Sequence, residues 1–194
     1  GEALASIAEV SHLLLRSRTA GRDAASELAV RAGEMGSVAP CSAAPGTTVE
    51  VRNLFCNTPV RRKFLKSLST EMGHVSEAFT RLAVAHADVH FTLRNQDRLL
   101  YDLPSTESWE QRLARFFGQE LVDRLIAVES QDDRVKLWGY VGDPSQSRPN
   151  NRTQYLFLNG RYVRDRSLQH ALSEAYRGLM LGGRYPVAFL CFEM

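Results

Sequence analysis

The first half of the chain mixes helical and extended patterns of hydrophobic residues. Leu4 and Ile7 belong to a series with helical spacing from residue 3 to residue 14, whereas Val49 and Val51 alternate with charged neighbours as in a half-buried strand. Thr58 suits a helix N-cap, because a proline follows it at the first helical position. These patterns predict helices over 3–14, 60–68 and from 69 or 70 to about 86, strands over 13–16, 27–32 and 47–54, and a loop over 33–46.

The second half begins with a hairpin pattern and continues with a new alternation of helix and strand signals. Two alternating runs flank Asn95-Gln96-Asp97, and Pro104 then interrupts the chain, so we predict a domain boundary between residues 103 and 104. Asn159-Gly160 is the dipeptide that most strongly favours a tight hairpin turn. The remaining pattern predicts strands over 89–94, 98–103, 125–128, 135–140, 154–158, 161–163 and 187–192, and helices over 109–117 and from 165 or 167 to 176. The fold class is therefore α/β or α+β, without an internal repeat.

Composition and charge exclude several classes of protein. The net charge of +2 is too small to indicate nucleic-acid binding unless basic residues cluster locally. The three cysteines are widely spaced and fit neither a disulfide framework nor a metal site, and the five histidines lack zinc-like spacing. No apolar run approaches the roughly 20 residues that a membrane span needs, so we expect a cytosolic protein with no membrane partner. Because the chain opens without methionine inside a helical pattern, we also expect it to be a piece of a longer protein.

Two segments of the first half could carry chemistry, and each also has a plainer structural interpretation. Gly1 precedes a helix whose first amides could bind a phosphate, but an ordinary helix cap is the commoner use of such a pattern. Thr47 and Thr48 bring hydroxyls into a strand where they could contact a ligand, although threonine is common at strand starts. The basic run over 61–63, with Lys66 a turn later, fits a solvated helix face at least as well as a phosphate contact.

A third segment sets three arginines, Arg161, Arg164 and Arg166, on the predicted hairpin and the helix start that follows it. Guanidinium groups in such a place could bind an anion, including a phosphate of DNA. Asp165 could instead hold one of them in a surface ion pair. The residues alone leave these two interpretations equally open. Since they offer no Ser/His/Asp arrangement and no paired carboxylates, any enzymatic chemistry must come from a nucleotide or from residues elsewhere.

In combination, these segments closely resemble the MutL family of DNA mismatch repair proteins. The longest matching runs are Gly1-Glu2-Ala3-Leu4-Ala5-Ser6-Ile7-Ala8, Gly46-Thr47-Thr48-Val49-Glu50-Val51, Leu54-Phe55-Cys56-Asn57-Thr58-Pro59-Val60-Arg61-Arg62-Lys63-Phe64-Leu65, and Gln154-Tyr155-Leu156-Phe157-Leu158-Asn159-Gly160-Arg161. The shorter runs Val10-Ser11, Ser17-Arg18-Thr19 and Arg164-Asp165-Arg166 match as well. They occur in the family's order and span nearly the whole chain. Cys56 stands where an aromatic residue is usual and Val60 where alanine is usual, and neither is a candidate site residue.

The resemblance implies a nucleotide-binding fold and assigns residues to it. We expect the back half of a GHKL (Bergerat) ATPase sandwich over 1–103, followed by a ribosomal-protein-like α/β transducer domain over 104–194. In this family ATP binding orders a lid and drives dimerisation of the N-terminal regions, and hydrolysis resets the protein. The residues that match the family's ATP motifs are the lid end Gly1, Glu2, Ala3 and Leu4, the threonine Thr47 and, less closely, Thr48.

The same resemblance places the rest of the ATPase machinery outside this chain. The general-base glutamate, the asparagine that holds Mg²⁺ and the adenine-binding aspartate of the family precede Gly1, and its γ-phosphate lysine follows Met194. We therefore expect no ATP hydrolysis by these residues alone, because phosphoryl transfer depends on positioning and charge stabilisation. Basic residues bind DNA in this family, and Arg161, Arg164 and Arg166 match their region.

Partners and location follow from the resemblance as further expectations. They are DNA without sequence preference, the mismatch-recognition protein MutS, a downstream repair nuclease or helicase, and a second copy of the protein when ATP is bound. The expected location is the bacterial cytosol, near the nucleoid during repair. Two alternatives stay open: another GHKL ATPase, such as a topoisomerase subunit or a chaperone, and a nonenzymatic nucleic-acid-binding module.

Overall fold

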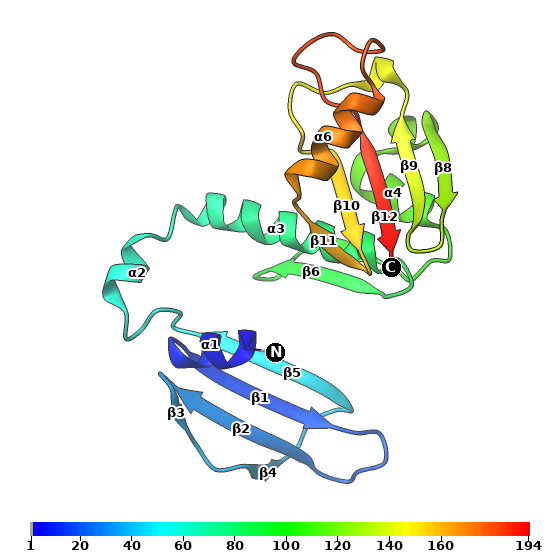
Figure 1. Ribbon diagram of the computed structural model, residues 1–194. Coiled ribbons are helices and arrows are strands. Elements are labelled where there is room, and N and C mark those ends of the chain that lie inside the picture. The colour runs from blue at the N-terminus through cyan, green and yellow to red at the C-terminus, as the bar shows by residue number, and fades with distance from the viewer. Residues whose placement is uncertain (1) are drawn as a thin grey trace. The chain divides into compact units, whose positions relative to one another are not determined.

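The computed structural model describes residues 2–194, and the chain packs as two compact units, Gly1–Glu71 and Met72–Met194. Helix α3 (Leu68–Ala85) contains the division between them. Mixed helices and sheets confirm the predicted α/β class (Figure 1). The division by packing does not test the domain boundary at 103/104, which stays a prediction.

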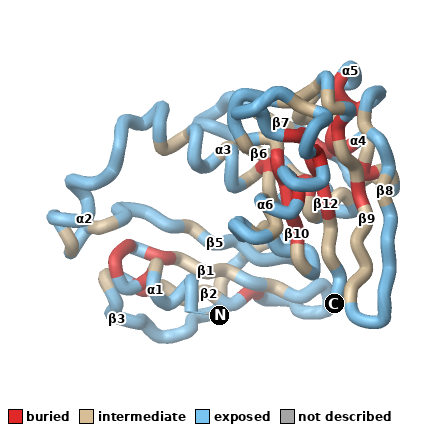
Figure 2. The backbone as a smooth tube through the Cα atoms, turned by 45° about the horizontal axis from the view of Figure 1, so that its top comes forward, coloured by how far each residue is buried: buried red, intermediate tan, exposed pale blue. Residues whose placement is uncertain are grey.

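The first unit is a sheet with one short helix packed on it. Its elements are α1 (Ala3–Glu9), β1 (His12–Arg18), β2 (Ala25–Arg31), β3 (Glu34–Met35), β4 (Ala39–Cys41), β5 (Gly46–Arg52) and α2 (Pro59–Lys63). The strands run in the order β3-β2-β1-β5, with β4 also paired to β2. Ala8 of α1 forms a small buried cluster with Leu13 and Val30, which fixes the helix against one face of the sheet (Figure 2).

Three predictions for this unit were wrong in detail. The first helix does not reach Leu14: it ends at Glu9, because Leu14 pairs with Ala29 and Glu50 in the sheet. The predicted loop over 33–46 contains the short strands β3 and β4, whose partner is the edge of β2. Helix α2 ends at Lys63 instead of residue 68, and its apolar residue Val60 is 67% exposed, so no packing supports a longer helix.

The second unit is built on a larger sheet with helices on both faces. After α3 come β6 (Phe91–Asn95), β7 (Arg98–Leu103), α4 (Trp109–Phe117), α5 (Gln119–Val122), β8 (Leu125–Gln131), β9 (Lys136–Gly142), η1 (Pro144–Gln146), β10 (Gln154–Leu158), β11 (Arg161–Val163), α6 (Arg166–Ala175) and β12 (Ala188–Glu193). The order β11-β10-β12-β9-β8 is antiparallel except for the parallel pair β10–β12. Strands β6 and β7 form a separate hairpin.

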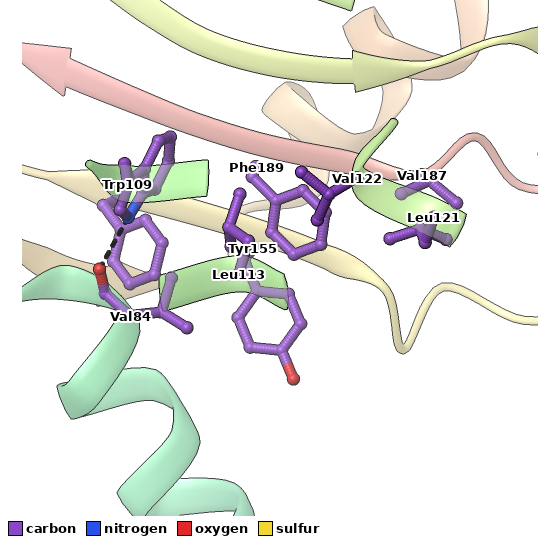
Figure 3. Close-up of a cluster of buried hydrophobic side chains, with 9 residues drawn as sticks. Val84, Trp109, Leu113, Leu121, Val122, Tyr155, Val187 and Phe189 are labelled. Carbon is purple, nitrogen blue, oxygen red and sulfur yellow. Dashed lines mark hydrogen bonds between the residues drawn. The ribbon is translucent and has the colours of Figure 1, made fainter. Parts of the chain in front are cut away.

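Alternation along β10 and β12 supplies a core on each face of this sheet. Tyr155 and Phe157 pack with Phe189 against residues of α4 and α5 (Figure 3). Leu156 and Leu190 point to the other face, where α6 covers them with Leu172 and Tyr176. These aromatic and aliphatic side chains dominate the burial in the unit.

A buried arginine ties α4 to the segments that flank the β6–β7 hairpin. Arg112 is 1% exposed, and its Nη2 donates to the carbonyl oxygens of Ala87 and Val89, both at 2.8 Å, and of Pro104 at 2.9 Å. Trp109 adds a second tie, since its Nε1 donates to the Val84 carbonyl at 2.7 Å. The start of α4 is therefore fixed to both the end of α3 and the segment after β7.

Candidate functional site

The predicted phosphate-binding residues lie at the start of α1. Gly1 lies outside the residues that the structure describes. Glu2 occupies the N-cap position without a side-chain cap, and its carbonyl accepts from the Ser6 amide at 3.0 Å. Ala3 and Leu4 form the exposed first turn, with Leu4 48% exposed. The first amides of a helix have no partner within the helix, so this turn has the donors that an anion requires.

Thr47 and Thr48 lie on opposite faces of the first sheet. Thr47 pairs with Ser17 of β1, and their hydroxyl oxygens are 2.9 Å apart. Thr48 pairs with Arg16. Because side chains alternate along a strand, Ser17 shares its face with Leu13 and therefore with the cluster under α1. Thr47 thus lies on the helix-covered face, and Thr48 on the other.

The face that carries Thr48 is occupied by ion pairs. Arg16 bonds Glu27 at 2.6 Å and Glu50 at 3.1 Å, and Arg52 bonds Glu50 at 2.8 Å. The two guanidinium groups and the two carboxylates balance one another, so Arg16 and Arg52 already have partners within the sheet. Thr48 therefore lies beside side chains that are engaged in ion pairs, whereas Thr47 lies beside the Ser17 hydroxyl on the helix-covered face.

Ser17 is a candidate that sequence reasoning missed as a site residue. Its position in β1 is ordinary, and only the register that sets it opposite Thr47 gives it a second hydroxyl as neighbour. Two hydroxyls can each donate and accept, so the pair can rearrange to hold a ligand without losing its own contact. The predicted strand over 13–16 stops one residue before Ser17, and the sequence did not show which strand pairs with it.

The basic run after Thr58 is exposed. Arg61, Arg62 and Lys63 form the last turn of α2, where cations complement the helix dipole. Within residues 2–194 no carboxylate lies within ion-pairing distance of them. A solvated helix face therefore accounts for this exposed basic run without a ligand.

The three candidate DNA-contacting arginines are exposed and lie around one turn and one helix start. Arg161 begins β11 opposite Leu158, after the Asn159-Gly160 turn, and Arg164 precedes the N-cap of α6. Arg166 is the first helical residue. Both turn residues have positive φ, 47° and 75°, as the tight hairpin predicted from this dipeptide requires.

Asp165 does not neutralise these arginines. Its Oδ1 accepts from the Leu168 amide at 2.9 Å and so caps α6. In the described part of the chain, no carboxylate comes within ion-pairing distance of Arg161, Arg164 or Arg166. A cation at the first turn of a helix is disfavoured by the helix dipole. The surface ion pair, one of the two interpretations of this segment, is therefore absent, and the guanidinium groups are accessible to an anion.

Over residues 2–194, the structure holds no group of three or more His, Cys, Asp and Glu side chains arranged to bind a metal ion. No helix among these residues is long and apolar enough to cross a membrane.

Comparison with known proteins gives consistent matches. A family model described as "DNA mismatch repair protein, C-terminal domain" matches residues 113–194. The chain is 42% identical over 194 residues to the DNA mismatch repair protein MutL of Anaeromyxobacter dehalogenans, and 40% identical over 198 residues to that of Pseudomonas fluorescens. These alignments cover 100% of the chain but 32% and 31% of the relatives, so it spans about a third of their length.

Solved structures match along the chain as well. The Aquifex aeolicus MutL ATPase domain complexed with ADP has a TM-score of 0.74 and 30% identity, covering 100% of this chain and 71% of that one. The 43K ATPase domain of Thermus thermophilus gyrase B, in complex with an aminocoumarin, has a TM-score of 0.50 and 13% identity, covering 96% and 56%. The second likeness concerns the fold alone.

Proposed function

Because the chain belongs to the MutL family of DNA mismatch repair proteins, we propose that it couples ATP binding in its first part to DNA contact in its second. The likenesses to MutL and gyrase B ATPase domains confirm the predicted family and GHKL-type fold. One observation carries the proposal: α1 and the Ser17–Thr47 pair lie on the same face of the first sheet. In addition, the chain resembles a MutL ATPase domain that was solved in complex with ADP.

The residues of this face fit a nucleotide. The first turn of α1 offers amide donors at the positive end of the helix dipole, which suits the triphosphate. We assign Gly1, Glu2, Ala3 and Leu4 to the end of the lid, and the Thr47 hydroxyl to a direct nucleotide contact. Thr48 is the weaker candidate, because it faces the ion pairs of Arg16.

ATP with Mg²⁺ would supply the phosphoryl group that is transferred, and the lid end and Thr47 would position the nucleotide. The lid end binds phosphate oxygens through backbone amides and thereby excludes water from them. Thr47 orients the nucleotide through its hydroxyl, which Ser17 holds in place. We assign the base, the magnesium ligand and the lysine to parts of the longer protein, so the inactivity of these residues alone stays a prediction.

The finer features of the family are likewise proposals for this protein. ATP-dependent pairing of N-terminal regions, coordination with MutS and a downstream nuclease or helicase, and a cytoplasmic location are what membership of the family suggests. The structure supports DNA contact because Arg161, Arg164 and Arg166 are exposed. Such arginines can neutralise phosphates without reading bases.

Replacing Thr47 with valine is expected to weaken ATP binding by about tenfold or more in the longer protein that carries this chain. Valine keeps the β-branched shape of threonine and removes the hydroxyl, and a hydrogen bond to a charged ligand contributes about 1.5–3 kcal/mol. Equilibrium binding of a fluorescent ATP analogue measures the change. Thr48→Val is the matched control and should stay within about twofold of the original affinity. If Thr47→Val bound ATP as tightly as the original protein, Thr47 would not contact the nucleotide.

Charge reversal at Arg166 is expected to weaken binding to all DNA sequences alike. Each neutralised phosphate releases counterions, so the slope of log affinity against log salt should flatten by about one unit on duplex DNA. Fluorescence anisotropy across a salt series, on the original chain and on Arg166→Glu, measures both quantities. Arg134→Glu, an exposed arginine beyond β8, is the control with the same charge change. An unchanged affinity and slope for Arg166→Glu would show that this residue does not contact DNA.

A further inference from the structure

A hollow of about 330 Å³ opens in the second unit where the end of α3, the start of α4 and the sheet approach one another. We call it the two-tryptophan pocket. Trp109, Trp138 and Phe157 contribute its aromatic wall, and Asp88, Glu107 and Glu193 line it as well. Its lining residues include neither the candidate nucleotide-contacting residues nor the candidate DNA-contacting arginines.

The aromatic wall is held in a fixed arrangement. The ring centroids of Trp109 and Trp138 are 5.0 Å apart at an interplanar angle of 61°, and those of Trp109 and Phe157 are 6.4 Å apart. Trp109 Nε1 donates to the Val84 carbonyl (Figure 3), and Trp138 Nε1 donates to Glu193 Oε1 at 2.8 Å. Both indole N–H groups are therefore used within the protein. Trp109 and Phe157 are 9% and 1% exposed, so the half-buried Trp138 supplies the ring that a ligand can reach.

The charge of the pocket is opposite to that of the whole chain. Asp88, Glu107 and Glu193 are exposed, and among residues 2–194 no cation lies within ion-pairing distance of any of them. The chain as a whole carries a net charge of +2. A local concentration of carboxylates repels phosphates and attracts cations. The half-buried Trp138 ring favours the same ligand, because ring faces attract cations through their quadrupole.

We propose that the two-tryptophan pocket receives an arginine side chain of a partner protein. A guanidinium group can stack on an indole while its forked N–H groups bond a carboxylate, whereas an ammonium group offers only a compact point charge. The exposed carboxylates can contact an incoming chain segment, and a hollow of about 330 Å³ has room for one long side chain. The proposal assigns the second unit a protein-binding surface separate from its DNA-contacting arginines.

Tryptophan fluorescence tests the proposal directly, because the sequence has two tryptophans and both line the pocket. The chain is titrated at low salt with acetyl-Gly-Arg-Gly-amide and, as a neutral analogue of the same shape, with acetyl-Gly-citrulline-Gly-amide. We expect the arginine peptide to change the emission saturably, with a dissociation constant on the order of 1 mM. The citrulline peptide should bind at least about tenfold more weakly.

A double variant assigns the binding to the carboxylates. Glu107→Gln with Glu193→Gln keeps the shape of both side chains and the acceptor for the Trp138 indole, so the fold should persist, as circular dichroism can verify. We expect about three- to tenfold weaker binding of the arginine peptide, since each exposed ion pair contributes modestly. Asp133→Asn, in the turn between β8 and β9, is the control and should not alter binding. Equal binding of the two peptides, no saturable signal, or an unaffected double variant would overturn the proposal.

Discussion

Replacing Gly139 with alanine is expected to destabilise the second unit by about 4 kcal/mol or more, enough to unfold much of the protein. Gly139 lies in β9 with φ of 140°, a conformation that side chains rarely adopt. A Cβ atom there would lie 2.2 Å from the Phe189 carbonyl oxygen and 3.1 Å from Leu190 Cα. Both contacts involve backbone of the neighbouring strand β12, so no side-chain rotation can relieve them.

Urea denaturation followed by tryptophan fluorescence measures this effect, because both tryptophans belong to the second unit. Gly182→Ala is the matched control: a Cβ there meets nothing within 4 Å, and its φ lies outside the region that side chains avoid. The control should stay within about 0.5–1 kcal/mol of the original stability. A similar midpoint for both variants would mean that β9 and β12 can separate to accept a side chain.

Nothing in the sequence distinguishes Gly139 from an ordinary strand glycine. The hydrophobic alternation on either side predicted the strand, and the structure extends it to Lys136–Gly142. The need for glycine arises from the close approach of β12, which follows β9 only after a long stretch of chain. Short-range patterns predict elements well, and they miss such demands because these come from pairing between distant segments.

The Asn159-Gly160 turn shows the opposite case. Its conformation depends on the two residues themselves, because both must have positive φ, and the sequence therefore predicted the β10–β11 hairpin correctly. Strands β3 and β4 were missed because strands of two and three residues carry no measurable alternation. Their existence depends on the exposed edge that β2 offers for pairing.

The candidate site likewise has some features that local sequence predicts and others that depend on strand pairing. The strand pattern alone selected Thr47 and Thr48 together, since nothing local separates two adjacent threonines in a strand, and only the family resemblance favoured Thr47. The register with β1 separates them by placing Thr47 opposite Ser17 and Thr48 opposite Arg16. The role of Asp165 was also undetermined, because capping α6 and pairing with an arginine use the same carboxylate. Only the geometry shows which contact forms.

Replacing Arg112 with methionine is expected to lower the free energy of unfolding by about 3–5 kcal/mol. Nothing in the sequence pointed to this role, since arginine is seldom fully buried. Methionine fills most of the space but leaves the carbonyls of Ala87, Val89 and Pro104 without their donor, and each unsatisfied buried acceptor costs about 1–3 kcal/mol. Burial lowers the pKa of the Arg112 guanidinium, and the negative charge of Asp88 opposes this shift.

Two further variants separate the hydrogen bonds of Arg112 from the loss of a charge on α4. Arg115→Met changes an exposed arginine one turn further along the same helix and should alter stability by no more than about 0.5 kcal/mol. Arg112→Lys keeps a positive charge and donors but not the planar fork, so it should recover only part of the loss. Urea midpoints of the three variants give the comparison. If Arg112→Met were as stable as Arg115→Met, the three carbonyls around Arg112 would have to find other donors. The arrangement of α3, the β6–β7 hairpin and α4 would then not depend on Arg112.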